Sequence, residues 1–136
     1  MKTPAKGTFV VKLTPQPPAP EIEEPAIGRM LIDKQFLGDL EASSKGQMLS
    51  TMGQVKGSAG YVAIERVAGI LHGLEGSFAL QHTGTMTRGT PELSVAVVPD
   101  SGTGELTGIS GKMTIENEGG KHSYVFEYAI TPELDS

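Results

Sequence analysis

The 136-residue sequence predicts an all-β fold, a closed eight-stranded antiparallel β-barrel with no substantial helix. Apolar and polar residues alternate with period two in many segments, as half-buried strands require, and no window of useful length shows a 3.6-residue period. Eighteen glycines and nine prolines, about a fifth of the chain, exceed average usage and supply many turns and bends. A barrel is favoured over a sandwich because the expected strands are long and interrupted by glycines, which lets a sheet curl and close.

The expected strands follow one another in a single domain, residues 1–136, with one long interruption. Five prolines fall between residues 15 and 25, and such a density excludes both a helix and a central strand. Residues 14–25 are therefore expected to form an extended, Pro-rich surface loop, either a stiff connection or a polyproline segment that binds a partner. The expected strands are residues 7–13, 28–36, 40–52 with a break near 43–46, 60–68, one within 69–88, 93–98, 107–117 and 122–130.

A glycine pattern occurs twice in the chain. Residues 69–80 and residues 104–115 share the pattern G-x-L-x-G-x-x-G-x-(Phe/Met)-x-(Leu/Ile). Glycine inside a strand lets the backbone bend or bulge at a barrel corner. We interpret the repeat as architecture rather than chemistry.

Composition and charge exclude several kinds of partner and site. The net charge is −5 and no two basic residues are adjacent, so nucleic-acid binding is not expected. The absence of cysteine excludes disulfides, thiolate metal sites and thiol nucleophiles. The apolar run 95–98 is far too short to span a membrane, and the N-terminus lacks the apolar core of a signal peptide. We therefore expect a soluble cytoplasmic protein without a cofactor.

A glycine-rich segment and several further segments carry a family resemblance. Residues 101–111, SGTGELTGISG, resemble the glycine-rich signature of the allene oxide cyclase-like barrels, which include the plant dirigent proteins. Residues 59–65, 76–82, 97–104 and 122–124 are similar to a bacterial family of unknown function, over about residues 28 to 130.

The resemblance implies an eight-stranded barrel with an apolar interior that assembles into a homo-oligomer, a dimer or a trimer. The characterised relatives steer cyclisation or radical coupling by holding a reactive small molecule in shape. The bacterial family itself has no established activity, so no catalytic residue is carried over, and fold alone does not assign a function.

His82 and Glu65 are the first candidate site residues. His82 follows the apolar face of its strand and is expected to point inward, either as an acid, base or ligand anchor or as a core histidine with an ordinary hydrogen-bond partner. Glu65 is in phase with Tyr61; if that face is inward, burial would raise the pKa of Glu65, as suits a general base. If Val62 and Ile64 face inward instead, Glu65 lies in a surface ion pair, and the alternation fits both.

Aromatic residues supply the other candidates. Tyr124, Phe126 and Tyr128 share one face of the last strand and, with Phe78, could form a wall against a planar ligand, or could simply be core.

The three histidines raise the question of a metal. Three histidines and a water form a known zinc site, but His72, His82 and His122 contain no close ligand pair, so we expect no metal site.

Two functions follow from these observations. The first is a barrel that binds a small apolar molecule, and acts on it or not, through the candidates Glu65, Phe78, His82, Tyr124, Phe126 and Tyr128. The second is a non-catalytic oligomeric scaffold whose barrel is filled by side chains and whose Pro-rich segment reaches a neighbour.

Overall fold

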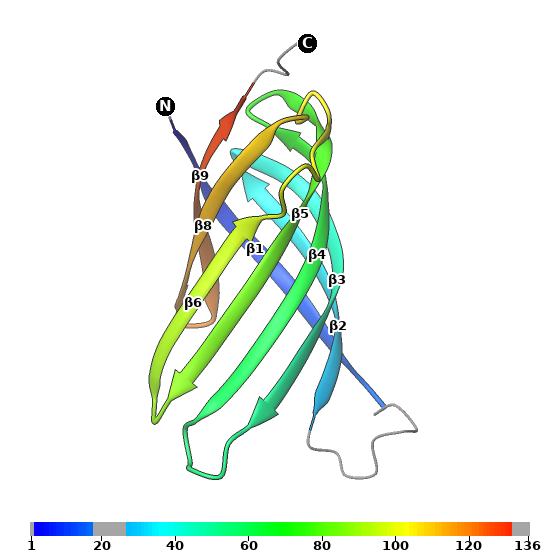
Figure 1. Cartoon of the computed structure of the whole chain (residues 1–136). Helices are drawn as coiled ribbons and strands as arrows, with labels where there is room; N and C mark the ends of the chain where they lie inside the picture. Colours follow the sequence, from blue (N-terminus) through cyan, green and yellow to red (C-terminus); the bar gives the residue numbers. More distant parts are fainter. Residues whose placement is uncertain (1, 18–26, 132–136) are drawn as a thin grey trace.

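The computed structural model describes residues 2–17 and 27–131, which form nine strands and no helix (Figure 1). Eight long strands pair in the order β4-β3-β2-β1-β9-β8-β6-β5, and β4 also pairs with β5, which closes the ring. The prediction of a closed eight-stranded antiparallel barrel is confirmed, with one extra strand, β7, that pairs with β5. The strands are β1 (Thr3–Gln16), β2 (Gly28–Gly38), β3 (Leu40–Met52), β4 (Ala59–Leu71), β5 (Leu74–Thr87), β6 (Thr90–Val97), β7 (Thr103–Gly104), β8 (Ile109–Glu118) and β9 (Lys121–Ile130).

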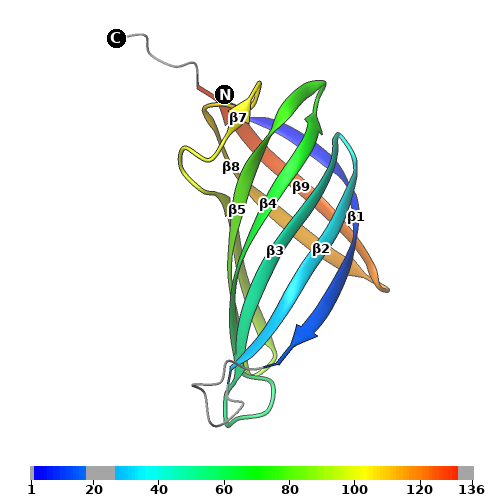
Figure 2. The same cartoon turned by 90° about the vertical axis from the view of Figure 1, so that its right-hand side faces the viewer.

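Tight turns join most neighbouring strands and define the two ends of the barrel. The β4–β5 turn has positive φ at His72 (47°) and Gly73 (80°), as a two-residue hairpin turn of type I′ requires. The backbone N–H of His72 donates to the carbonyl oxygen of Asp39 in the β2–β3 turn, over 3.0 Å. We call the half with these two turns the closed half and the half with the β3–β4 and β5–β6 turns the open half; Figure 2 shows strands β1 to β5 running between them.

Two expectations about the strands are corrected by the pairing, one about where β1 ends and one about a break within β3. β1 continues to Gln16, so residues 14–16 belong to a strand rather than to the Pro-rich loop, whose residues 18–26 lie outside the described part of the chain. Pro15 is accommodated because β1 pairs with β9 only over Thr3–Phe9, and the rest of β1 has the strand β2 alone beside it. The break expected near residues 43–46 is also wrong, since β3 pairs without interruption with β4.

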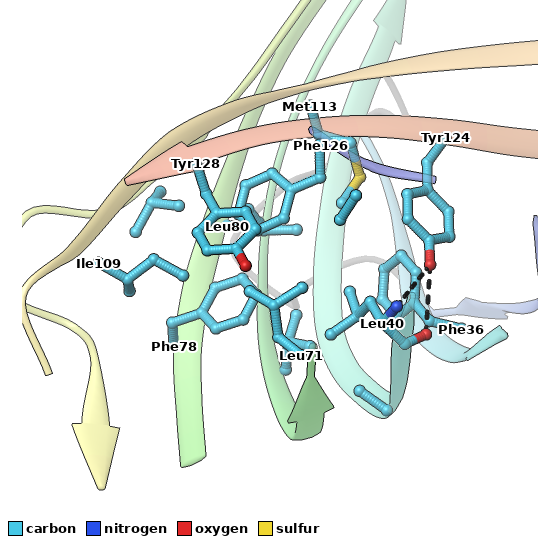
Figure 3. Close-up of a cluster of buried hydrophobic side chains, with 14 of the residues drawn as sticks. Phe36, Leu40, Leu71, Phe78, Leu80, Ile109, Met113, Tyr124, Phe126 and Tyr128 are labelled. Carbon is cyan, nitrogen blue, oxygen red and sulfur yellow. Dashed lines mark hydrogen bonds between the residues drawn. The ribbon is translucent and has the colours of Figure 1, made fainter. Parts of the chain in front are cut away.

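Side chains fill the closed half of the barrel (Figure 3). Phe126 stacks on Phe78 and on Tyr128, with ring centroids 5.6 and 5.5 Å apart. The hydroxyl of Tyr124 accepts a hydrogen bond from the backbone N–H of Leu40, which satisfies a polar atom inside the core. This half is a packed core with contributions from every long strand. Its members include Ala5, Phe36, Leu40, Ala42, Val67, Leu71, Phe78, Leu80, Val97, Leu106, Ile109, Met113, Tyr124, Phe126 and Tyr128.

The glycine-rich segment around β7 lies against β5 at the closed half. It places Leu106 in the core, where that side chain is 1% exposed. A Cβ on Gly76 would lie 2.2 Å from the carbonyl oxygen of Thr103, so β5 and β7 can approach only because residue 76 is a glycine.

The wall of the open half is incomplete between β1 and β6. The β8–β9 hairpin is short, and its tip at Gly119 and Gly120 ends beside the middle of β1. β6 pairs with β8 at the single pair Ala96 and Lys112. Among the described residues, Val10–Gln16 of β1 and Thr90–Val95 of β6 therefore have a strand on one side only, and Figure 1 shows both strands continuing past the hairpin. None of the described residues forms a helix that could cross a membrane.

Candidate ligand-binding site

The structure decides which face of β4 points inward. Val62 and Ile64 are 50% and 55% exposed on the outside of the barrel, whereas Ala63 and Val67 are buried. Glu65 shares their phase and has no exposed surface at all. Of the two alternatives that the sequence left open, the inward one is therefore correct.

Glu65 is held by side chains from three other strands, the neighbours β3 and β5 and the next strand β2. Its Oε1 accepts a hydrogen bond from the Ser44 hydroxyl of β3 at 2.6 Å, and its Oε2 accepts one from the Lys34 ammonium of β2 at 2.8 Å. Oε2 also lies 2.5 Å from Nε2 of His82 on β5. All four residues are at most 5% exposed, so the cluster is a buried polar network inside an apolar barrel.

Glycine at position 46 makes room for this network. Gly46 stands opposite Glu65 in the β3–β4 register, and a Cβ there would lie 2.9 Å from the Cβ of Glu65 and 2.1 Å from the carbonyl oxygen of Ile64. The missing side chain lets the two strands approach closely at the point where Glu65 turns toward Ser44 and Lys34.

The expected rise in the pKa of Glu65 is wrong, because its partners outweigh its burial. Burial alone would raise the pKa, but the hydrogen bond from His82, the charge of Lys34 and the hydrogen bonds from Lys34 and Ser44 lower it from 4.5 to about 2. Glu65 is therefore an ionised acceptor near neutral pH rather than a poised general base.

The ionised state of Glu65 fixes the orientation of His82. A carboxylate can only accept hydrogen bonds, so Nε2 of His82 carries the hydrogen and donates it. In the neutral ring, Nδ1 is then an acceptor. No described residue donates a hydrogen bond to this atom, yet no fully shielded side-chain nitrogen or oxygen among the described residues lacks a partner. Nδ1 is therefore not fully shielded by the described residues.

The His82 side chain lines a cavity of about 180 Å³ in the open half of the barrel. Lys34 and His82 line its wall, and both contact Glu65. The ammonium of Lys34 also lies 4.7 Å from the ring centroid of Phe9. Most of the lining is apolar; its members are Phe9, Val11, Leu13, Ile32, Lys34, Met48, Tyr61, Ala63, His82, Leu93, Ile115 and His122.

A second hollow of about 360 Å³ adjoins this cavity toward the β3–β4 and β5–β6 turns. Met48, Tyr61 and Leu93 line both spaces and thus lie between them. The Tyr61 ring lies over Gly84. A Cβ on residue 84 would be 2.2 Å from the ring, so the tyrosine takes this position only because residue 84 is a glycine. Burial, and then the charge of Glu65, raise the pKa of Tyr61, which therefore stays a neutral hydroxyl near neutral pH.

The structure brings together only some of the candidates named from the sequence. Glu65 and His82 are in contact beside the cavity. The other four candidates lie in the packed core of the closed half, and none of them lines the 180 Å³ cavity. These four residues are Phe78, Tyr124, Phe126 and Tyr128.

Two members of the cluster were missed by sequence reasoning. Lys34 falls between Ile32 and Phe36 on the inward face of β2, and a charged residue in an apolar phase was a signal that could have been used. Ser44 shows no comparable signal, because serine is common on both faces of a strand.

The remaining histidines are separated by the fold. His72 lies at the closed half, where its Nδ1 is 2.6 Å from the Tyr128 hydroxyl. His122 lines the same cavity as His82 and stacks on Phe9, with ring centroids 4.9 Å apart. In residues 2–17 and 27–131, no group of three or more His, Asp or Glu side chains could hold a metal ion.

Comparison with known proteins places the chain in a family. It is similar to a solved structure of a protein of unknown function from the DUF3224 family of Shewanella oneidensis MR-1, with 51% sequence identity and a TM-score of 0.90 over 98% of this chain and 100% of that one. No match was found among proteins of curated function, and the wider resemblance to allene oxide cyclase-like barrels stays a prediction. Residues 5–128 match the family described as a protein of unknown function, DUF3224. The chain therefore belongs to the DUF3224 family.

Proposed function

We propose that this protein binds a small, mainly apolar molecule in the open half of its barrel, against the polar wall formed by Lys34 and His82. The observation that carries the proposal is a cavity of about 180 Å³ with apolar sides and a buried, hydrogen-bonded charge cluster at one wall. Ligand sites commonly combine an apolar lining with a few convergent polar groups.

The size of the cavity indicates the size of the occupant. An apolar cavity of roughly 150 Å³ is large enough to bind benzene. A molecule with one ring fits the inner cavity, and a longer apolar tail fits the adjoining hollow of about 360 Å³.

The energetics of the cluster support a role beyond stability. Placing Lys34 and Glu65 inside the barrel removes two charges from water, and this desolvation offsets much of their attraction. Apolar residues of similar volume would stabilise the barrel as well or better. A buried ion pair beside a cavity is thus more readily explained by a ligand than by folding.

The filled scaffold, our second hypothesis, fits only one half of the molecule. The closed half is packed with side chains, whereas the open half contains both spaces described above. Assembly into a dimer or trimer and a cytoplasmic location stay predictions, as does any reaction on the bound molecule.

Filling the cavity tests the proposal. Ala63→Leu adds a side chain at a buried position of the lining, and Ala68→Leu adds the same atoms on the exposed face of the same strand. We expect the cavity variant to weaken binding of the fluorescent probe N-phenyl-1-naphthylamine by at least about tenfold, because the probe would span both spaces and the new side chain takes the room that its phenyl ring needs in the inner cavity. The control variant should bind as the wild type does.

Thermal unfolding of both variants shows whether they are folded. Equal probe binding by the folded Ala63→Leu variant and the wild type would contradict the proposal. Native mass spectrometry of gently purified protein gives an independent measurement, in which a retained small mass identifies the natural ligand.

A further inference from the structure

We propose that the ligand is a neutral molecule with an acidic hydroxyl group, such as an enol or a phenol, and that Nδ1 of His82 accepts its hydrogen bond and takes its proton. This inference rests on the proposed function, since it assigns the polar contact within the same cavity.

Within the cluster of Lys34, Ser44, Glu65 and His82, one acceptor has no donor among the described residues. Glu65 uses Oε1 for Ser44 and Oε2 for Lys34 and His82, so its oxygens already have three donors. His82 is buried, and its Nε2 donates to Glu65. Its Nδ1 has no donor among the described residues, and a ligand that supplies one completes the network.

The charges of the cluster favour a neutral ligand over a carboxylate. Lys34 and Glu65 balance each other, so with a neutral His82 the cluster carries no net charge. A carboxylate would bring a negative charge without a counterion of its own between apolar walls, and its desolvation is costly because Glu65 already balances Lys34. A neutral hydroxyl enters without that cost.

The pairing of His82 with Glu65 also suits proton uptake. In the proposed step the O–H bond of the ligand breaks, its proton forms the Nδ1–H bond, and the electron pair stays on the ligand oxygen. The resulting imidazolium lies between the ligand oxyanion and the ionised Glu65, which stabilises it as a carboxylate stabilises a catalytic histidine. The net charge of the site is unchanged by this transfer.

Four titratable groups surround the His82 ring and set the conditions of the test. Glu65 and Tyr61 lie on β4, Lys34 on β2 and His122 on β9, and all contact the ring or line the same cavity. The measurements therefore belong at one fixed pH, below the pH at which the free probe ionises.

Three probes with the same nitrophenyl ring separate the alternatives. 4-Nitrophenol has an acidic hydroxyl, 4-nitroanisole replaces it with a methyl ether, and 4-nitrobenzoate carries a carboxylate. We expect the wild type to bind 4-nitrophenol at least about tenfold more tightly than 4-nitroanisole, which corresponds to about 1.4 kcal/mol. The bound 4-nitrophenol should show the visible absorption of the phenolate.

His82→Gln tests the residue itself. Its amide can still donate to Glu65, but it has no basic ring nitrogen, so the preference for 4-nitrophenol and the phenolate band should both be lost. His72→Gln makes the same exchange at the closed half, outside the cavity, and should keep both signals.

The results also distinguish this inference from the proposed function. Binding of 4-nitroanisole as tight as that of 4-nitrophenol, tightest binding of 4-nitrobenzoate, or saturation with 4-nitrophenol without a phenolate band would each overturn the inference while the apolar site stands. Failure of every probe, including N-phenyl-1-naphthylamine, would overturn the proposed function as well. If His82→Gln does not fold, the ¹⁵N signals of the His82 ring in the wild type decide, because 4-nitrophenol must convert an unprotonated Nδ1 into a protonated one.

Discussion

At the scale of single residues, the chemistry of the barrel centres on a carboxylate without exposed surface. Glu65 stays ionised because Lys34, Ser44 and His82 reach its two oxygens from three other strands. Each partner depends on it in turn, since the ammonium of Lys34 is otherwise surrounded by the rings of Phe9 and Phe36. Loss of one member therefore leaves another buried and unsatisfied.

Substitution of the ion pair should be strongly non-additive. Glu65→Gln leaves the Lys34 charge buried without its counterion and should lower the free energy of unfolding by about 3–5 kcal/mol. Lys34→Met in the same chain removes that unpaired charge and should restore most of the loss. Urea unfolding of the two single variants and the double variant measures the coupling. Strictly additive effects would show that the two groups act independently.

The ionisation of Glu65 should make stability depend on pH in the acid range. The folded pKa of about 2 lies below the ordinary value of 4.5, so the contribution is fully present above about pH 4.5 and is lost as the pH falls toward 2. The shift corresponds to about 3 kcal/mol. Between about pH 5 and pH 2, the wild type should therefore lose about that much more stability than Glu65→Gln/Lys34→Met. Parallel pH profiles for the two proteins would contradict the assignment.

At the scale of strands, glycines decide how closely neighbours approach. Gly46 lets β3 lie close to β4 at the position opposite Glu65. A Cβ on residue 46 would be 2.7 Å from the Cα of Glu65. This need comes from a tertiary contact and not from a turn, because β3 is regular at that position.

Alanine substitution should separate this glycine from an ordinary one. Gly46→Ala forces two paired backbones apart and should cost about 2 kcal/mol or more. Gly60→Ala on β4 is the matched control: a Cβ there meets nothing nearer than the carbonyl oxygen of Gly84 at 3.9 Å, so its effect should stay within about 1 kcal/mol. Urea unfolding measures both, and equal losses would contradict the close approach at position 46.

At the scale of the whole molecule, the closed half of the barrel is packed with side chains, whereas the open half contains the two spaces described above. Eight strands enclose the packed core of the closed half, whereas the open half lacks strand pairing between β1 and β6 among the described residues. Stability should be distributed accordingly, because local opening is easiest where a strand has a partner on one side only.

Hydrogen exchange along β1 should reveal this division within one strand. Gly7–Phe9 pairs with both β2 and β9, and Val10–Gln16 pairs with β2 alone. We expect the amides of the first segment to exchange at least about tenfold more slowly than those of the second. Uniform protection along β1 would show that something covers the second segment in solution.

Sequence patterns predicted the strands well because the period of two is a local property. The ambiguity at Glu65 was physical: Val62 and Ile64 on the outside are as apolar as Ala63 and Val67 on the inside, so alternation could not choose. Two features could not be predicted, namely the continuation of β1 through Pro15 and the position of the cavity. Both depend on where β9 stops pairing with β1, and that is a non-local feature. The aromatic residues of β9 were correctly seen to share a face, but which half of the barrel they fill is set by register.

The short β8–β9 hairpin has a consequence for how such a barrel could diversify. Its glycine turn lies near His122, which lines the cavity, while the core depends on the opposite ends of the same strands. Adding residues in pairs at this turn would lengthen the hairpin without changing the phase of either strand. The extended hairpin would lie along Val10–Gln16 of β1 and Thr90–Val95 of β6, which have a strand on one side only among the described residues. Under the proposed function, the length of this one loop would set which molecules reach the cavity, independently of the residues that hold the fold together.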